Sequence, residues 1–375
     1  MRPVRSMTSC VWFAPGRANL MGEHTDYNEG YVLPFALAQG VTATAAVRPG
    51  RLLELRSRQV PDEPVTIALD ALEPGAVDGW AAYPAGVAWA LHQDGAEVTG
   101  ASIDIDSDLP VGAGVSSSAA LECSVALALC SLSGVPAERR SLAAIARRAE
   151  NDFVGAPTGI IDQYAALLCQ EGHALLLDCA TLNVTQVPFR PAEADVAALI
   201  VDTRVAHALV SGEYGRRRAE CEEAARLLGV PFLGAVTDPA AASRLADPIL
   251  RRRARHVISD SARARAIASA LASDEPLAES YRFTGHLLTE AHISLRDDFE
   301  VSWPEADVTV EVANAAGALG ARMIGGGFGG SVLALIPTGR MTAVRAALTE
   351  AFTQRSWKPP EFIDAVPSAA ARRLA

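Results

Sequence analysis

Residues 109–120 read Leu-Pro-Val-Gly-Ala-Gly-Val-Ser-Ser-Ser-Ala-Ala, a glycine loop that runs into three consecutive serines. Before this loop, apolar and polar residues alternate over 101–106, which predicts a half-buried strand. After it, residues 121–132 contain no glycine or proline and are rich in Ala and Leu, which predicts a helix ending near Gly134. The predicted order is therefore strand, glycine loop and serine-headed helix.

This order favours a phosphate site. Glycines let a backbone approach an anion without a Cβ clash, and the first N–H groups of a helix have no partner within it. The helix dipole favours negative charge at the same end, and serine hydroxyls add donors and a possible Mg²⁺ ligand. A serine-capped helix after a flexible loop is the structural alternative. No Gly-Lys-Ser/Thr follows, so the loop is not a Walker motif, but it half-matches a dinucleotide fingerprint with Ser117 at the third glycine position.

Composition narrows the function classes. The chain has 375 residues, half of them hydrophobic, which allows two domains with sizeable cores. Its net charge of −11 and pI of about 5.2 argue against nucleic-acid and anionic-membrane partners, which need a basic face. No apolar run is long enough for a transmembrane helix, and the N-terminus lacks the apolar region of a secretory signal. The six cysteines form no C-x-x-C pair, which predicts reduced thiols and a cytoplasmic protein.

Three further segments carry candidate chemistry. Residues 15–28 form a long polar loop between apolar strands, which favours function over a solvated connection. A helix predicted over 137–153 carries Glu150 in its last turn, where a negative charge opposes the helix dipole and calls for a compensating cation unless it lies on the surface. Thr158 is expected to cap the next helix, which places Asp162 near its first turn, where simple helix-start chemistry is the alternative.

The second half of the chain contains fewer motifs that indicate a function. Residues 190–195 are polar and contain a proline, which predicts a boundary between an N-terminal domain (1–190) and a C-terminal domain (191–375). The run 323–331 matches G-x-G-x-x-G, but a strand follows it where a dinucleotide fold requires a helix. This mismatch argues against an oxidoreductase. The tail after Pro367 is expected to fray.

Taken together, the motifs resemble a known family. Residues 16–28, Gly-Arg-Ala-Asn-Leu-Met-Gly-Glu-His-Thr-Asp-Tyr-Asn, resemble the galactokinase signature. Residues 109–120 resemble the phosphate loop of the GHMP small-molecule kinases, and 323–331 their third motif. Segments 155–164, 211–218 and 292–301 are also similar to galactokinase segments, so the resemblance spans nearly the whole chain. The departures remove no polar group that the chemistry uses: they are Ala18, Met21, Val115, Ala156, Thr158 and Ser331.

The resemblance implies a fold and a reaction. The implied fold class is α+β, with an N-terminal sugar- and ATP-binding α/β domain of the ribosomal-protein-S5 kind, a C-terminal α+β GHMP kinase domain, and the active site between them. The implied reaction is transfer of phosphate from ATP to the anomeric hydroxyl of α-D-galactose, the first step of the Leloir pathway. Mg²⁺ is the implied cofactor and the small molecules galactose and MgATP the partners, with no nucleic acid or membrane, and we expect a monomer.

Site residues follow from the matched motifs. Asp162 is implied as catalytic base and Arg17 as stabiliser of the transition state. The implied sugar-binding residues are Glu23, His24, Thr25, Asp26, Gly159 and Tyr214. The implied ATP-binding residues are Gly112, Ala113, Gly114, Val115, Ser116, Ser117 and Ser118. The implied metal ligands are Ser118 and Glu150.

Elementary chemistry agrees with these roles. Fixed donors and acceptors around a sugar reject an epimer that leaves buried groups unpaired, a carboxylate serves as base, and a guanidinium fits a transferring phosphoryl group. Two alternatives stay open: a related kinase acting on N-acetylgalactosamine or galacturonate, and a non-catalytic galactose sensor. Whether Asp162 takes the proton fully or mainly positions the hydroxyl also stays open.

Overall fold

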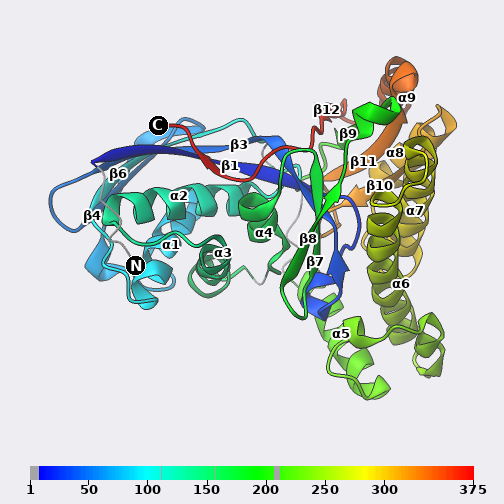
Figure 1. The fold of residues 1–375 in the computed structure, drawn as a ribbon, viewed down its shortest axis with the longest axis horizontal. Helices are drawn as coiled ribbons and strands as arrows, with labels where there is room; N and C mark the ends of the chain where they lie inside the picture. Colours follow the sequence, from blue (N-terminus) through cyan, green and yellow to red (C-terminus); the bar gives the residue numbers. More distant parts are fainter. Residues whose placement is uncertain (1–7, 111, 157, 207–211) are drawn as a thin grey trace.

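The computed structural model describes residues 8–110, 112–156, 158–206 and 212–375. Val111, Pro157 and Ser211, which belong to the motifs above, lie outside these ranges. Within them the strands form three sheets of six, four and three strands, and helices pack around all three (Figure 1). No helix among the described residues combines the length and apolarity needed to cross a membrane.

The six-stranded sheet has the order β13-β1-β3-β6-β4-β5. β4 runs parallel to β6, and the other neighbours pair antiparallel. Its strands are β1 (Ser9–Asn19), β3 (Pro34–Val47), β4 (Leu52–Ser57), β5 (Val60–Ala68), β6 (Ala101–Ser107) and β13 (Arg372–Arg373). The strand predicted over 101–106 is confirmed as β6, and it runs directly into the glycine loop.

Helix α2 (Ser117–Ser133) is the central helix of this first half. It lies along β1 and β3, and α1 (Ala82–Gln93) and α3 (Arg139–Arg148) pack on its other side (Figure 1). Because α2 is enclosed between sheet and helices, it is apolar nearly all round and lacks a polar face. The predicted serine-headed helix is therefore confirmed, with Ser116 as its N-cap residue.

The segment after α3 differs from the prediction. The α-helix gives way to a π-helical turn over Ala149–Val154, and α4 (Ile161–Leu168) begins three residues after Thr158. The N-cap residue of α4 is Ile160, so the prediction that Thr158 caps this helix is wrong. The Thr158 hydroxyl donates instead to Glu150 Oε2 at 2.8 Å. Single π turns occur frequently at functional sites.

The second half is built on an antiparallel sheet of order β10-β11-β9-β12. Its strands are β9 (Val196–Asp202), β10 (Gly320–Ile324), β11 (Ser331–Pro337) and β12 (Glu361–Asp364). The helices around it are α5 (Glu213–Leu228), α6 (Pro248–Leu271), α7 (Leu277–Asp297), α8 (Pro304–Ala315) and α9 (Met341–Gln354). α6 and α7 run side by side (Figure 1). A separate buried cluster of apolar side chains fills this half.

The third sheet has the order β2 (Tyr31–Val32), β7 (His173–Asp178) and β8 (Asn183–Pro188). Short 3₁₀ turns connect the main elements at Asp26–Asn28, Leu69–Ala71, Gly79–Ala81, Pro191–Ala194, Leu233–Ala235, Pro239–Arg244 and Thr338–Arg340.

The C-terminal tail returns to the first sheet and does not fray. β13 pairs with the middle of β1, where Arg373 lies opposite Trp12. Beyond it, the Leu374 N–H donates to the Val11 carbonyl at 2.8 Å, and the Val11 N–H donates to the Ala375 carbonyl at 3.0 Å. The prediction of a frayed tail is therefore wrong, because these backbone groups find partners on the edge of β1.

Candidate active site

The end of β1 brings Arg17 against the glycine loop. The Arg17 N–H donates to the Val115 carbonyl at 3.1 Å. A Cβ on Gly16 would lie 2.7 Å from that same oxygen, so only glycine allows this close approach. The guanidinium of Arg17 then reaches across the loop and donates from Nη1 to the Gly114 carbonyl at 2.6 Å.

Arg17 also forms an ion pair with Asp162. Arg17 Nε lies 2.8 Å from Asp162 Oδ1, and the Ser116 hydroxyl donates to Asp162 Oδ2 at 2.5 Å. The two charged side chains are only 9% and 19% exposed, which makes water a weak competitor. Three residues that lie far apart in the sequence are thus joined at one carboxylate, and each had been predicted to belong to the site.

The glycine loop bends sharply where it enters α2. Ser116 adopts a left-handed backbone with φ of 60°, which is costly for a residue other than glycine and is typical of functional sites. The Ser116 side chain turns toward Asp162, Ser117 is exposed, and the Ser118 hydroxyl donates to Glu150 Oε1 at 2.8 Å. The N–H groups of the first helical turn are left to meet a ligand.

The second glycine-rich run supports this loop from behind. The Ser331 hydroxyl donates to the Ala113 carbonyl at 2.7 Å, and Cβ atoms added to Gly325 or Gly330 would contact the backbone of Gly114 or Ala113. The run between β10 and β11 is therefore a tight bend that lets two backbones pack together.

Glu150 is a buried carboxylate without a cationic partner among the described residues. Its Oε1 accepts from the Ser118 hydroxyl, and its Oε2 accepts from Thr158 Oγ1 and Gln163 Nε2, both at 2.8 Å. Burial raises the pKa of Glu150, and the nearby charge of Asp162 adds to this effect while the three hydrogen bonds oppose it. Such a site is stabilised by a bound cation.

The loop after β1 contains the remaining predicted residues. Glu23 Oε1 accepts from Arg322 Nη2 at 2.6 Å and from the Gly325 N–H at 2.9 Å. The Thr25 hydroxyl lies within hydrogen-bonding distance of the carbonyl oxygens of Gly22 (2.9 Å) and Tyr31 (2.8 Å). Thr25 thus fixes the shape of its own loop.

Asp26 lies directly against Gly159. A Cβ on Gly159 would fall 1.5 Å from Asp26 Oδ2, so this position accepts only glycine while Asp26 stays in place. Burial raises the pKa of Asp26 to about 6; backbone N–H donors oppose this effect, and the charges of Asp162 and Glu23 add to it. Asp26, Glu23 and Asp162 therefore share one electrostatic environment.

Aromatic rings pack around His24 in the same loop. His24 has a left-handed backbone, and its Nδ1 lies 3.0 Å from the Tyr27 hydroxyl. The His24 ring packs 4.6 Å from Phe299 and 5.7 Å from Tyr214, centroid to centroid. Burial lowers the pKa of His24 well below its usual value, so the imidazole is neutral at pH 7. Tyr214 is brought to the loop by the first turn of α5.

Sequence analysis did not identify several residues that contact the site. Thr158 and Gln163 hold Glu150, while Arg322 and Asp260 contact the loop that carries Glu23. One signal was available for Arg322, because it is the only charged residue in the otherwise apolar run 320–324, and a buried charge must be paired.

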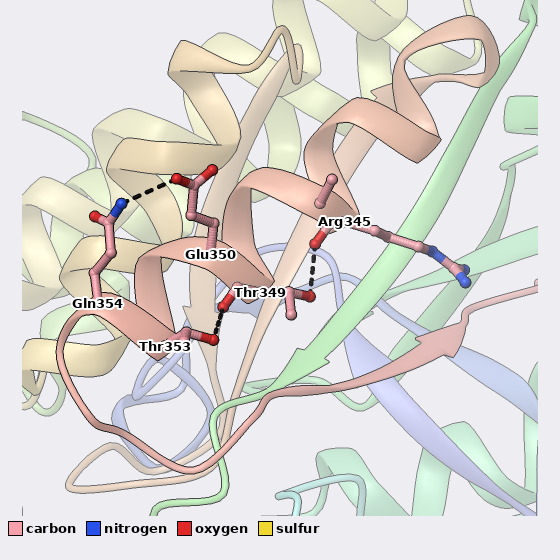
Figure 2. Close-up of a pocket in the computed structure, with 6 residues that line it drawn as sticks. Arg345, Thr349, Glu350, Thr353 and Gln354 are labelled. Atoms are coloured by element: carbon pink, nitrogen blue, oxygen red, sulfur yellow. Dashed lines mark hydrogen bonds between the residues drawn. The ribbon is translucent and has the colours of Figure 1, made fainter.

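A surface hollow of about 670 Å³ lies elsewhere, along α9. Its lining side chains bond mainly within the helix, as Figure 2 shows for Gln354 and Glu350, whose side chains are 3.0 Å apart. None of the predicted site residues lines it.

Comparisons with known proteins agree with the motifs. The family described as galactokinase galactose-binding signature matches residues 5–47, GHMP kinases N terminal domain matches 82–170, and GHMP kinases C terminal matches 266–354. A galactokinase of Streptomyces coelicolor is 47% identical over 97% of this chain and 94% of its own length. A galactokinase of Mycobacterium tuberculosis is 45% identical over 91% of this chain and 94% of its own.

Solved structures similar to this chain also include a galactokinase. Lactococcus lactis galactokinase complexed with galactose superposes with a TM-score of 0.92 at 32% identity, covering 98% of this chain and 96% of that one. A mevalonate kinase superposes with a TM-score of 0.66 at 16% identity, covering 97% and 98%, which is a likeness of fold alone.

Proposed function

Because this chain belongs to the galactokinases of the GHMP kinase family, we propose that it transfers the γ-phosphoryl group of ATP to the anomeric hydroxyl of α-D-galactose. The products are galactose 1-phosphate and ADP. The observation that carries the proposal is the carboxylate of Asp162, which joins Arg17 and the glycine loop through Ser116 and faces the charge of Asp26.

Asp162 and Arg17 are the catalytic residues of this proposal. Asp162 accepts or orients the proton of the attacking hydroxyl, and Arg17 offsets charge on the transferring phosphoryl group. Their ion pair of 2.8 Å supports this division, because the guanidinium fixes the direction of the carboxylate that meets the hydroxyl.

The sugar is held by the loop after β1 and by Gly159 and Tyr214. Glu23 and Asp26 supply acceptors, and neutral His24 supplies a donor or an acceptor from its second ring nitrogen. Thr25 keeps the loop in shape. Enclosing the sugar among fixed polar groups and aromatic rings is what lets a site reject an epimer.

ATP is held by residues 112–118, whose backbone leads into the N-terminus of α2. The chain contains a single lysine, Lys358, which lies in an exposed loop after α9. We expect backbone N–H groups, Arg17 and a metal ion to share the charge of the triphosphate.

Mg²⁺ fits the donor set at Ser118 and Glu150. Their oxygens lie 2.8 Å apart, and the buried carboxylate has no ion pair with a described side chain. Mg²⁺ takes one or two protein oxygens and keeps water and phosphate oxygens for the rest, so two protein ligands are enough. When bound, the ion neutralises phosphate charge; Thr158 and Gln163 keep Glu150 oriented toward it.

We further propose the division into domains 1–190 and 191–375, with a monomer as the working unit. The free cysteines, five of them buried, support a reducing cytoplasmic setting.

A panel of sugars tests the proposal. Purified protein with ATP and Mg²⁺ is assayed for ADP release with galactose, N-acetylgalactosamine, galacturonate and glucose. We expect turnover with galactose and little with the others. Galactose binding without ADP release would instead identify a sensor, and preferred turnover of another sugar would identify a related kinase.

A further inference from the structure

β10 carries a charge into the core. All five of its residues are buried, and the Arg322 side chain is completely inaccessible to solvent. A buried guanidinium persists only where its donors find acceptors, so its partners indicate what the charge is for.

Arg322 is directed at the sugar loop. Its Nη2 donates to Glu23 Oε1 at 2.6 Å and lies 3.3 Å from the Asn19 carbonyl, while its Nη1 lies 3.8 Å from Asp260 Oδ2. The Gly325 N–H donates to the same Glu23 Oε1 at 2.9 Å. Both donors use one oxygen of the carboxylate, so the other oxygen, Oε2, is the one left for a ligand.

Asp260 fixes the backbone of the same loop from α6. Its Oδ2 accepts from the N–H groups of Gly22 at 3.2 Å and Glu23 at 3.1 Å, and its side chain is fully buried. Its Oδ1 lies 3.3 Å from Arg263 Nη1. One helix thus holds the backbone at Glu23, and one strand holds the tip of its side chain.

We propose that Arg322 and Asp260 are positioning residues that set the orientation of the Glu23 carboxylate, and through it the affinity and selectivity for the sugar. This inference rests on the proposed function, because it takes Glu23 Oε2 as an acceptor for a sugar hydroxyl. An acceptor held from two sides cannot turn to follow a hydroxyl of the other configuration, so its fixed direction discriminates between epimers.

Two conservative variants probe the pair. R322K keeps the charge but loses the planar fork that reaches Glu23 and Asp260 at once. D260N keeps an acceptor for the loop N–H groups but removes the charge facing Arg322. R345K is the matched control, because Arg345 pairs with Asp364 at the surface.

Galactose dissociation constants from calorimetry and KM values for both substrates are measured for each variant. We expect R322K and D260N to weaken galactose binding about tenfold or more, with KM for ATP changed by less than about twofold, and R345K to match the wild type. A merely structural role would lower the amount of folded protein without shifting the two KM values differently.

A double-mutant cycle with E23Q completes the test. If Arg322 acts through Glu23, R322K adds little to the loss already caused by E23Q. Unchanged galactose affinity in R322K or D260N, or fully additive losses in the cycle, would overturn the inference. If R322K does not fold, the galactose affinity of D260N and the double-mutant cycle of D260N with E23Q test the inference by the same criteria. Failure of the wild type to bind galactose would instead refute the proposed function.

Discussion

Replacing Asp162 with Asn separates chemistry from binding. The amide has nearly the same shape, so its Oδ1 can still accept from Arg17 Nε, 2.8 Å away in the native protein. The amide nitrogen replaces the oxygen that accepts from Ser116, and that hydroxyl can turn to accept instead. Asn cannot take a proton at neutral pH, however, so the attacking hydroxyl loses its base.

The expected loss follows from these contacts. A positioned general base contributes about 10²–10⁴-fold in rate, which corresponds to about 3–5 kcal/mol in the barrier. Losing the charge on one partner of the Arg17 pair costs about 1–3 kcal/mol of folding stability, because both side chains are largely shielded. The variant should therefore fold, with a lower melting temperature and kcat at or below about one hundredth of the wild-type value.

The assay pairs turnover with binding. ADP release gives kcat, and calorimetry gives the galactose dissociation constant, which we expect to stay within about threefold of wild type because sugar contacts remain. Asp152→Asn is the matched control, since Asp152 lies exposed in the π turn. If kcat of the Asp162→Asn variant stays within about tenfold of wild type, the assignment of the base is refuted.

Three other predictions concern the neighbouring residues. Gly159→Ala should raise KM for galactose about tenfold, because the new Cβ displaces Asp26. Gly339→Ala is the control and should leave KM unchanged, because a Cβ there meets nothing within 4 Å. Equal KM values for the two variants would contradict the packing argument. Folding raises the pKa of Asp26 to about 6, so its contribution to stability is lost as pH rises through 6. We therefore expect Asp26→Asn to melt at a higher temperature than wild type at pH 7.5 and at the same temperature near pH 3, which melting curves check. We also expect the wild-type KM for galactose to rise below pH 6, which a pH profile of KM checks. A variant that melts at a lower temperature than wild type at pH 7.5 would show that ionised Asp26 stabilises the fold, contrary to this prediction. Glu150→Gln should raise the half-saturating Mg²⁺ concentration about tenfold. It should also raise the melting temperature at neutral pH, because it removes a buried charge. An unchanged Mg²⁺ titration would show that Glu150 is not a metal ligand.

Local patterns predicted the first half of the site well. The strand, glycine loop and helix over 101–133 could be recognised from the sequence because each step depends on neighbouring residues. The polar loop at 15–28 was recognised for the same reason. The side chains of Arg17, Ser116 and Asp162 meet in the structure as the family resemblance implied, and their chemical roles stay predictions.

Long-range contacts explain what the sequence could not predict. Thr158 has the local features of a helix cap, but Glu150 offers a buried acceptor and the helix begins later. The partner of Arg322 can be identified only once β10 is placed beside the loop that carries Glu23. Such competition between a local preference and a distant partner is decided by packing, which no short window of sequence contains.

The pairing of β13 with β1 has a consequence during synthesis. The ribosome makes β1 long before β13, because nearly all of the described chain lies between these two strands. Until β13 has been made, the outer edge of β1 therefore presents unpaired backbone groups to its surroundings, in the form that most readily recruits a foreign strand. Nascent chains that stop short of residue 372 keep this edge open, so incomplete products are the species most exposed to aggregation and to capture by chaperones.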